Sequence, residues 1–194
     1  MNRKRSLIKT TKKAKSEFIH VIHPWPPIYD ENSKVLLLGS LPSPKSLASG
    51  FYYGSPQNIF WSTLAKTLGV DEPEKSKEAR LSFALKHRVA IWITLKEAGI
   101  IGAQDSTIKN PVPNDFSDIL KNSQIRTIFT EGKKATELFN KLAAPKIGQE
   151  SVYLPSTSPA NRAHRPNRFL WNVGIWLKTL LMTDLKRKYC YCRF

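Results

Sequence analysis

Apolar residues along the chain follow two patterns whose alternation predicts the fold. Short runs of aliphatic and β-branched side chains predict buried strands at residues 34–39, 89–95, 126–130 and 151–155. Apolar positions at helical spacing predict helices at residues 60–69, 74–85, 114–120, 133–142 and 169–182, with Asn114 as the expected N-cap of the third. Strand–helix alternation is typical of a parallel sheet covered by helices on both faces. We therefore predict a single domain of the α/β class.

Two of the predicted strands end in loops that are rich in glycine, proline and hydroxyl groups. The strand at 34–39 runs into GSLPSPKS, and the strand at 151–155 runs into PSTSPANRAHRP. In open α/β sheets, ligands bind beyond the carboxyl ends of the strands. Both loops should open at that edge of the sheet, so we expect them to form one shared site.

Each of these loop residues also has an ordinary structural explanation. Gly39 and Pro42 are typical turn formers after a strand. Tyr52 and Tyr53 are of a kind that packs in cores, and Asn58 precedes a helical pattern, where asparagine commonly caps the helix. Taken one at a time, these residues do not indicate a function.

The net charge points to a polyanionic partner. Thirty-one Lys and Arg residues against 15 Asp and Glu give +16 and a pI near 10.0, which favours nucleic acid, or less commonly an anionic membrane. The alternative is a basic protein without a specific target. Residues 1–15 hold seven basic side chains and no acid, so the remainder still carries 16 − 7 = +9. We expect a flexible basic arm at 1–17, a folded domain at 18–185 and a basic tail at 186–194.

The chain shows no pattern of metal ligands. Cys190 and Cys192 are separated by one residue, which makes a poor disulfide, and no second pair completes a metal site. His20 and His23 lack further ligands nearby in the sequence. No run of 18 apolar residues occurs that could cross a membrane. We expect a reduced, cytoplasmic protein that uses neither a metal nor a cofactor.

Three motifs together resemble one known family. GSLPS begins at Gly39, YYGSPQNIFW begins at Tyr52, and LPSTSPAN begins at Leu154. This combination resembles the hypoxanthine (deoxyinosine) DNA glycosylases of the uracil-DNA glycosylase superfamily, as do IKNPVPNDFSDIL and TIFTEGKKATELF between them. The resemblance runs from about Pro24 to Asn161.

The resemblance implies a central four-stranded parallel sheet flanked by helices and a monofunctional enzyme of base excision repair. Such an enzyme flips deoxyinosine out of damaged DNA and hydrolyses its N-glycosidic bond. Hypoxanthine leaves, and an abasic site remains. The implied partner is DNA with a deaminated base, bound inside the cell by a monomer, with no metal, cofactor or membrane involved.

The resemblance also implies roles for particular residues. Asn58 is the implied catalytic residue, whose carbonyl oxygen orients water at the anomeric carbon. Tyr53 is the first choice to stack on the flipped base. The implied base pocket comprises Gly39, Ser40, Leu41, Pro42, Tyr52 and Tyr53. The implied DNA contacts are Ser43, Ser156, Thr157, Ser158, Asn161, Arg162, His164 and Arg165.

Three positions depart from patterns found elsewhere in the superfamily. Leu41 stands where the first motif has Asp or Asn, and Leu154 stands where classical uracil enzymes have His. Both departures favour the hypoxanthine branch. Ile93 stands where a polar or acidic residue is expected even in that branch. The alternatives are therefore a uracil or xanthine (mismatch-specific) glycosylase, or a catalytically impaired basic DNA-binding protein.

Overall fold

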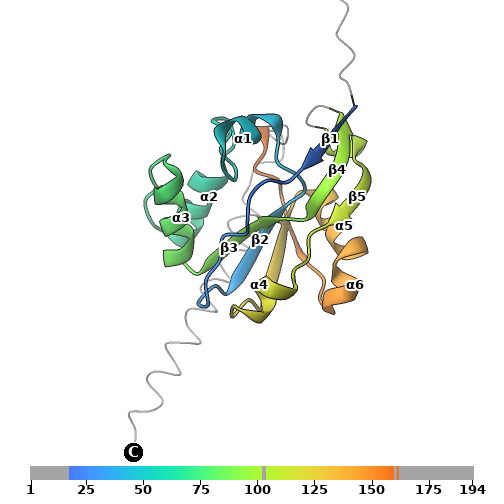
Figure 1. Cartoon of the computed structure of the whole chain (residues 1–194). Coiled ribbons are helices and arrows are strands. Elements are labelled where there is room, and N and C mark those ends of the chain that lie inside the picture. Colours follow the sequence, from blue (N-terminus) through green and yellow to red (C-terminus); the bar gives the residue numbers. More distant parts are fainter. Residues whose placement is uncertain (1–17, 102–103, 160, 162–194) are drawn as a thin grey trace, which may run out of the picture.

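The computed structural model describes residues 18–101, 104–159 and 161, and its centre is a parallel sheet (Figure 1). The four strands are arranged in the order β3-β2-β6-β7, and every neighbouring pair is parallel. Their bounds are Val35–Gly39 (β2), Val89–Ile93 (β3), Thr127–Glu131 (β6) and Val152–Leu154 (β7). The predicted α/β fold with a four-stranded parallel sheet is confirmed.

A second, antiparallel sheet in the order β1-β4-β5 was not predicted. Its strands are Phe18–Ile22 (β1), Leu95–Ile101 (β4) and Lys109–Pro113 (β5). The apolar run at 89–95, expected to be one strand, bends at Thr94 and passes from one sheet to the other. Thr94 N–H donates to the Gly39 carbonyl and Leu95 N–H donates to the Ser40 carbonyl, so the bend is held against the end of β2.

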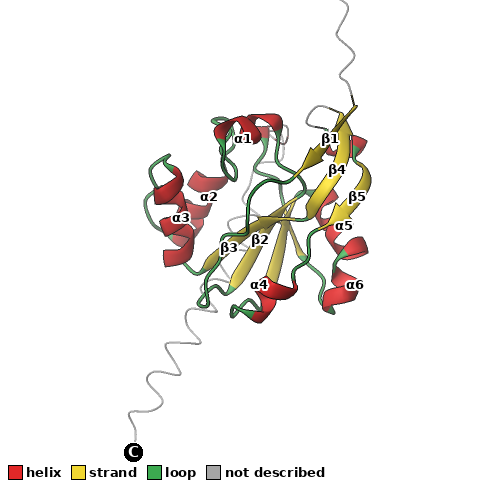
Figure 2. Cartoon of the chain, viewed as in Figure 1, coloured by secondary structure: helices red, strands yellow, loops and turns green. Residues whose placement is uncertain are grey.

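Helices cover both faces of the parallel sheet (Figure 2). They are α1 (Pro44–Ser49), α2 (Phe60–Leu68), α3 (Lys77–Lys86), α4 (Ser117–Lys121), α5 (Lys133–Leu142), α6 (Ala144–Ile147) and the 3-10 turn η1 (Asp105–Thr107). The prediction that Asn114 caps α4 is wrong, because its side-chain amide donates to the Ile93 carbonyl and Phe116 precedes the helix instead. The helix expected at 169–182, the basic arm and the basic tail lie outside the described residues.

Alternate side chains of each central strand enter two different cores. Leu37 of β2 packs with α2 and α3, in the cluster that contains Phe60 and Phe83. Leu38, its neighbour in sequence, packs with α4 and α5, in the cluster that contains Phe116. All four residues before Gly39 are fully buried, as expected for a strand covered on both faces. This double burial fixes β2 and therefore the point at which its carboxyl-end loop leaves the sheet.

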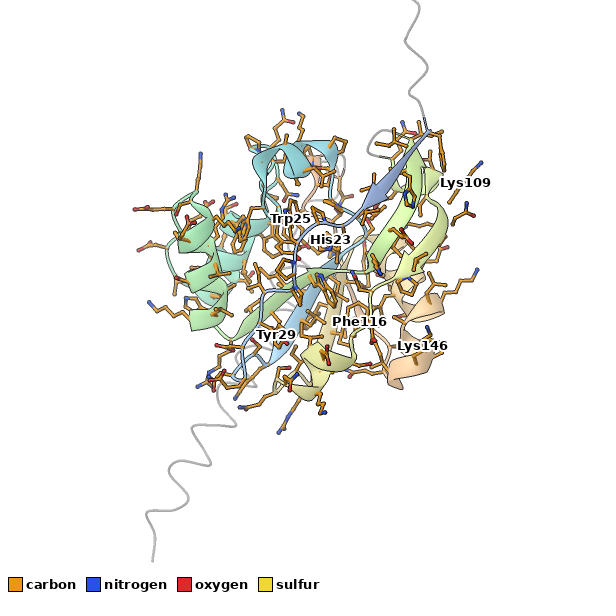
Figure 3. The ribbon with its side chains drawn as sticks, viewed as in Figure 1. His23, Trp25, Tyr29, Lys109, Phe116 and Lys146 are labelled. Atoms are coloured by element: carbon orange, nitrogen blue, oxygen red, sulfur yellow. The ribbon has the colours of Figure 1, made fainter. Side chains whose placement is uncertain are left out.

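Figure 3 shows the described side chains on the ribbon. His23 and Trp25, which are both half-buried, lie near the middle of this view, whereas the exposed Lys109 and Lys146 lie toward its edge. Burial lowers the pKa of His23 to about 4, so this side chain is neutral at pH 7. Within the part of the chain that the structure describes, no helix is both long and apolar enough to cross a membrane.

Candidate active site

Asn58 lies in the loop that leads from α1 to α2, and its side chain is half-buried. The carbonyl oxygen Oδ1 accepts a hydrogen bond from the Phe60 N–H at 2.9 Å, and the Asn58 N–H donates to the Ser55 carbonyl at 2.9 Å. The first of these bonds fixes the direction of the carboxamide at the start of α2. Because a carbonyl oxygen has two lone pairs, Oδ1 can still accept a hydrogen bond from water.

The loop of Asn58 touches the loop that follows β7. The Ile59 N–H donates to the Thr157 carbonyl at 3.3 Å. In Figure 1 the orange segment after β7 accordingly rises toward α1 and the loops beside it. Two motifs about 100 residues apart in sequence thus meet at the carboxyl edge of the sheet, where α/β proteins bind ligands.

Gly132 is the reason that the loop after β7 can lie so close to β6. Its φ is +90°, and a Cβ at this position would lie 3.3 Å from the Ser156 Cβ. The Gly132 N–H also donates to the Leu154 carbonyl at 2.8 Å. A side chain here would strain the backbone and press on the loop, so glycine is required by conformation and by space.

The loop after β2 is anchored by an acid that sequence reasoning did not identify. The buried Ser40 hydroxyl donates to Asp105 Oδ2 at 2.8 Å. Burial raises the pKa of Asp105, while the hydrogen bond from Ser40 and the charge of Lys134 act in the opposite direction. Asp105 lies in a segment without clear hydrophobic periodicity, so its acidic side chain was the only signal for it in the sequence.

The other predicted residues of this loop occupy different environments. Leu41 is partly buried and packs against the cluster of Leu95, Ala98 and Leu138. Pro42 is half-buried. Ser43 caps α1, since its hydroxyl accepts from the Ser46 N–H at 3.2 Å. The Ser43 side chain therefore has a structural role at the helix start in addition to its predicted contact with DNA.

The structure distinguishes the two adjacent tyrosines. Tyr52 is 2% exposed, and its hydroxyl donates to the Pro26 carbonyl at 2.8 Å, so it lies in the core and not in a pocket open to a base. Tyr53 is half-buried and stacks on Phe60 with ring centroids 3.7 Å apart and an angle of 4°. Its backbone has φ +52°, and its buried hydroxyl has no hydrogen-bond partner among the described residues. A Cβ on Gly39 would lie 3.3 Å from that hydroxyl.

A second buried acid, Glu131, lies beneath the loop after β7 and was also not identified from the sequence. Thr157 is 3% exposed and donates its hydroxyl to Glu131 Oε2 at 3.0 Å. The Thr157 side chain therefore holds the loop to β6 and is not free to contact a phosphate, contrary to its predicted role. Burial raises the pKa of Glu131 to about 8, although the hydrogen bonds from Thr157 favour the ionised form.

The rest of the loop after β7 is braced by its own hydrogen bonds. Ser156 Oγ accepts from the Ser158 N–H at 3.2 Å, and the Asn161 side-chain amide donates to the Ser156 carbonyl at 2.9 Å. Ser156, Ser158 and Asn161 are partly exposed, which fits the predicted contact with DNA. Arg162, His164 and Arg165 lie outside the described residues.

Two surface hollows lie elsewhere on the protein. One, of about 360 Å³, is lined by residues between Pro113 and Leu120 and between Leu142 and Ile147, around α4 and α6. The other, of about 330 Å³, is lined by residues that include Tyr29, Trp92 and Asp118. Neither is lined by residues of the three motifs, so we do not place the base in either of them. The described part of the chain also contains no group of three or more His, Cys, Asp or Glu side chains that could hold a metal ion.

Comparison with known proteins identifies the family. The model of the uracil DNA glycosylase superfamily matches residues 26–181, which is most of the chain. The chain belongs to this superfamily.

Individual members of the superfamily agree with the assignment. A protein of Methanosarcina acetivorans named hypoxanthine DNA glycosylase is 36% identical over 145 residues, which cover 74% of this chain and 90% of the relative. One of the same name from Methanosarcina barkeri is 35% identical over 146 residues with the same coverage. The solution structure of a candidate uracil DNA glycosylase from M. acetivorans has a TM-score of 0.70 and 32% identity, and the match covers 82% of this chain and 99% of that one.

Ile93, the third of the positions that depart from the expected pattern, lies in an apolar environment. Ile93 is 4% exposed, and its side chain would lie 3.7 Å from a Cβ on Gly39. The hydroxyl of the next residue, Thr94, is buried without a hydrogen-bond partner among the described residues. The loop after β2 is contacted by an acid from η1, Asp105, whereas Ile93 of β3 is apolar.

Proposed function

We propose that this protein is a DNA glycosylase that removes hypoxanthine from deoxyinosine in damaged DNA. The superfamily acts on bases in DNA, and two relatives that match three quarters of the chain are named for hypoxanthine. The observation that carries the proposal is the contact between Ile59 and Thr157, which brings the Asn58 carboxamide to the loop after β7. The reaction is hydrolysis of the N-glycosidic bond, with an abasic site as the product.

Asn58 is proposed to position the attacking water. Loss of the base leaves a positively charged, oxocarbenium-like sugar, which a neutral water can attack without a strong general base. An amide oxygen at the right place is sufficient, because orientation alone lowers the barrier substantially. The Phe60 N–H supports this role by holding Oδ1 in one direction while the second lone pair stays available for water.

Tyr53 is proposed as the platform for the flipped base. Its stack with Phe60 covers one face of the ring and holds the plane in place, and the residue as a whole is only half-buried. Stacking of a base on an aromatic side chain contributes about 1–3 kcal/mol. Ser43, Ser156 and Ser158 are proposed to contact the flanking phosphates, where hydroxyl and backbone N–H groups fix the register of the DNA.

The test is excision from end-labelled duplexes that contain one inosine, followed by alkali cleavage at abasic sites. Wild type should cleave the inosine strand, and Asn58→Ala should lose at least about 100-fold in single-turnover rate while it still binds the duplex. Ser62→Ala, which removes a hydroxyl bonded to the Ile59 carbonyl on the first turn of α2, is the control for a change near Asn58. Near-normal excision by Asn58→Ala would refute its assignment.

Parallel duplexes with uracil or xanthine test the alternative substrates. A faster rate on either would replace hypoxanthine as the preferred base and leave the glycosylase chemistry intact. Tight, salt-sensitive binding without any abasic product would instead identify a DNA-binding protein that does not turn over.

A further inference from the structure

A buried carboxyl group lies beneath the loop after β7 of the candidate site. Glu131, the last residue of β6, is 6% exposed and pairs in register with Leu154 of β7. Its Oε2 accepts from the Thr157 hydroxyl at 3.0 Å, whereas Oε1 is buried and has no hydrogen-bond partner among the described residues. An unpartnered carboxyl oxygen in the interior destabilises the fold, so packing alone does not account for this side chain.

Thr157 connects this carboxyl group to the loop of Asn58. The Thr157 side chain bonds to Glu131, and its carbonyl accepts from the Ile59 N–H at 3.3 Å. Ile59 follows Asn58 directly, and the next N–H, that of Phe60, holds the Asn58 carbonyl oxygen at 2.9 Å. A displacement of Thr157 would therefore be transmitted to the Asn58 amide through one hydrogen bond.

Tyr53 brings the loop of Asn58 close to Glu131 by a second route. Burial raises the pKa of Tyr53 well above its ordinary value, and the charge of Glu131 is the next cause. Tyr53 also stacks on Phe60, the residue whose N–H orients Asn58. Glu131 thus interacts with one residue of each motif loop, Thr157 and Tyr53.

We propose that Glu131 is a positioning residue for base excision, which sets the place of the Asn58 loop through Thr157. This inference rests on the catalytic role proposed above for Asn58. Its physical basis is the sensitivity of catalysis to geometry, since a misplacement of about 1 Å can lower a rate by about 100-fold. Removing either partner of the Glu131–Thr157 hydrogen bond should therefore slow excision without weakening the binding of DNA.

The state of the carboxyl group gives the proposal a signature in pH. Because burial raises the pKa of Glu131 to about 8, the group is neutral at pH 7 and ionises above pH 8. The titratable side chain whose pKa Glu131 influences is Tyr53, which stays neutral over this range because burial raises its pKa well above the ordinary value. On the side of β2, Asp105 is bonded to Ser40. An ionised Glu131 would place a buried negative charge, which accepts hydrogen bonds from Thr157, behind the loops, and this charge would oppose the negative charge that develops on the departing base. Excision should fall as the pH rises through about 8.

The experiment measures single-turnover excision from an inosine duplex between pH 6 and 10, together with DNA affinity and melting temperature. Glu131→Leu and Thr157→Val should lower the rate at pH 7 by about 10–100-fold at unchanged affinity for DNA. Glu131→Gln and Thr157→Ser retain the hydrogen bond and should stay within about threefold of wild type. Glu131→Gln should also lose the decline above pH 8, because an amide does not ionise.

Thr127→Val is the matched control, because Thr127 is similarly buried, at 8% exposed, and lies at the opposite end of β6. It should excise at the wild-type rate. Wild-type rates in folded Glu131→Leu and Thr157→Val would overturn the proposal, as would an unchanged pH profile in Glu131→Gln. Should the first two fail to fold, a rate of Glu131→Gln or Thr157→Ser more than about tenfold below wild type would overturn the proposal, because both variants retain the hydrogen bond. If Asn58→Ala loses excision while Glu131→Leu keeps the wild-type rate, only the positioning role is refuted. If the wild-type protein itself does not excise hypoxanthine, the proposed function is refuted.

Discussion

Replacing Glu131 by Gln should change how the stability of the protein depends on pH. The pKa of Glu131 rises from an ordinary value of 4.5 to about 8 because the side chain is buried. Between these two values the unfolded chain has released a proton that the folded protein retains. The unfolded state then binds fewer protons, so the free energy of unfolding decreases as the pH rises from about 4.5 to about 8. Above about pH 8, Glu131 is ionised in both states and adds no further pH dependence.

The size of this effect follows from the interval between the two pKa values. At 1.36 kcal/mol per pKa unit, the full interval corresponds to a loss of stability on the order of 5 kcal/mol above pH 8, of which about 3 kcal/mol is already lost at pH 7. A typical domain has only about 5–15 kcal/mol of net stability, so a loss of this size is easily measured.

Glu131→Gln removes the ionisable group and retains an oxygen that can accept from Thr157. The new amide N–H₂ needs a partner, which adds a constant cost of about 1–3 kcal/mol if it finds none. The diagnostic quantity is therefore the slope of the free energy of unfolding against pH. Urea unfolding followed by tryptophan fluorescence at pH 5, 6, 7, 8 and 9 should show the variant gaining on wild type by several kcal/mol between pH 5 and 8. Parallel curves would mean that the Glu131 carboxyl group ionises normally in the folded protein.

Three further outcomes are expected. Gly132→Ala should lower stability by about 1–2 kcal/mol, because its φ of +90° is unfavourable with a Cβ, and should slow excision by displacing Ser156; an unaffected melting temperature would contradict this. Tyr52→Phe loses the bond to the Pro26 carbonyl and should cost about 1 kcal/mol in urea unfolding at an unchanged excision rate, whereas a slower rate would return Tyr52 to the base pocket. Replacing Lys12, Lys13 and Lys15 by Gln should weaken the salt dependence of DNA binding. The slope of log K against log salt concentration should fall in magnitude by about 0.9 for each phosphate that these side chains neutralise, and an identical slope would exclude them from the interface.

The parts of the fold that were predictable are those in which burial dictates the pattern. Strands covered on both faces read as continuous apolar runs, and Leu36, Leu37 and Leu38 identified β2 for that reason. The antiparallel sheet could not be found in this way. Phe18 and Ile22 of β1 are exposed, and β5 contains two prolines, so neither strand shows the expected alternation. The passage from β3 to β4 at Thr94 is held by hydrogen bonds from Thr94 and Leu95 to the end of β2 and the residue after it, which are distant in sequence.

The candidate site was predictable in its loops but not in its supports. Asn58, Tyr53 and the loop after β7 belong to motifs whose spacing could be read directly. Asp105 and Glu131 act through hydrogen bonds to Ser40 and Thr157, and such pairings appear only when the chain is folded. The roles of adjacent residues such as Tyr52 and Tyr53 were separated only by the three-dimensional packing.

The hydrogen bond between Ile59 and Thr157 also has a consequence for the newly synthesised chain. The strands that carry the two motifs are not neighbours in the sheet, because β6 lies between them and must be in place first. Closing a segment of about 100 residues is slow and comes late in folding. A nascent chain that ends after the first three quarters of the polypeptide would therefore be unable to break glycosidic bonds. Hydrolytic activity would appear only once the loop after β7 has been synthesised and packed.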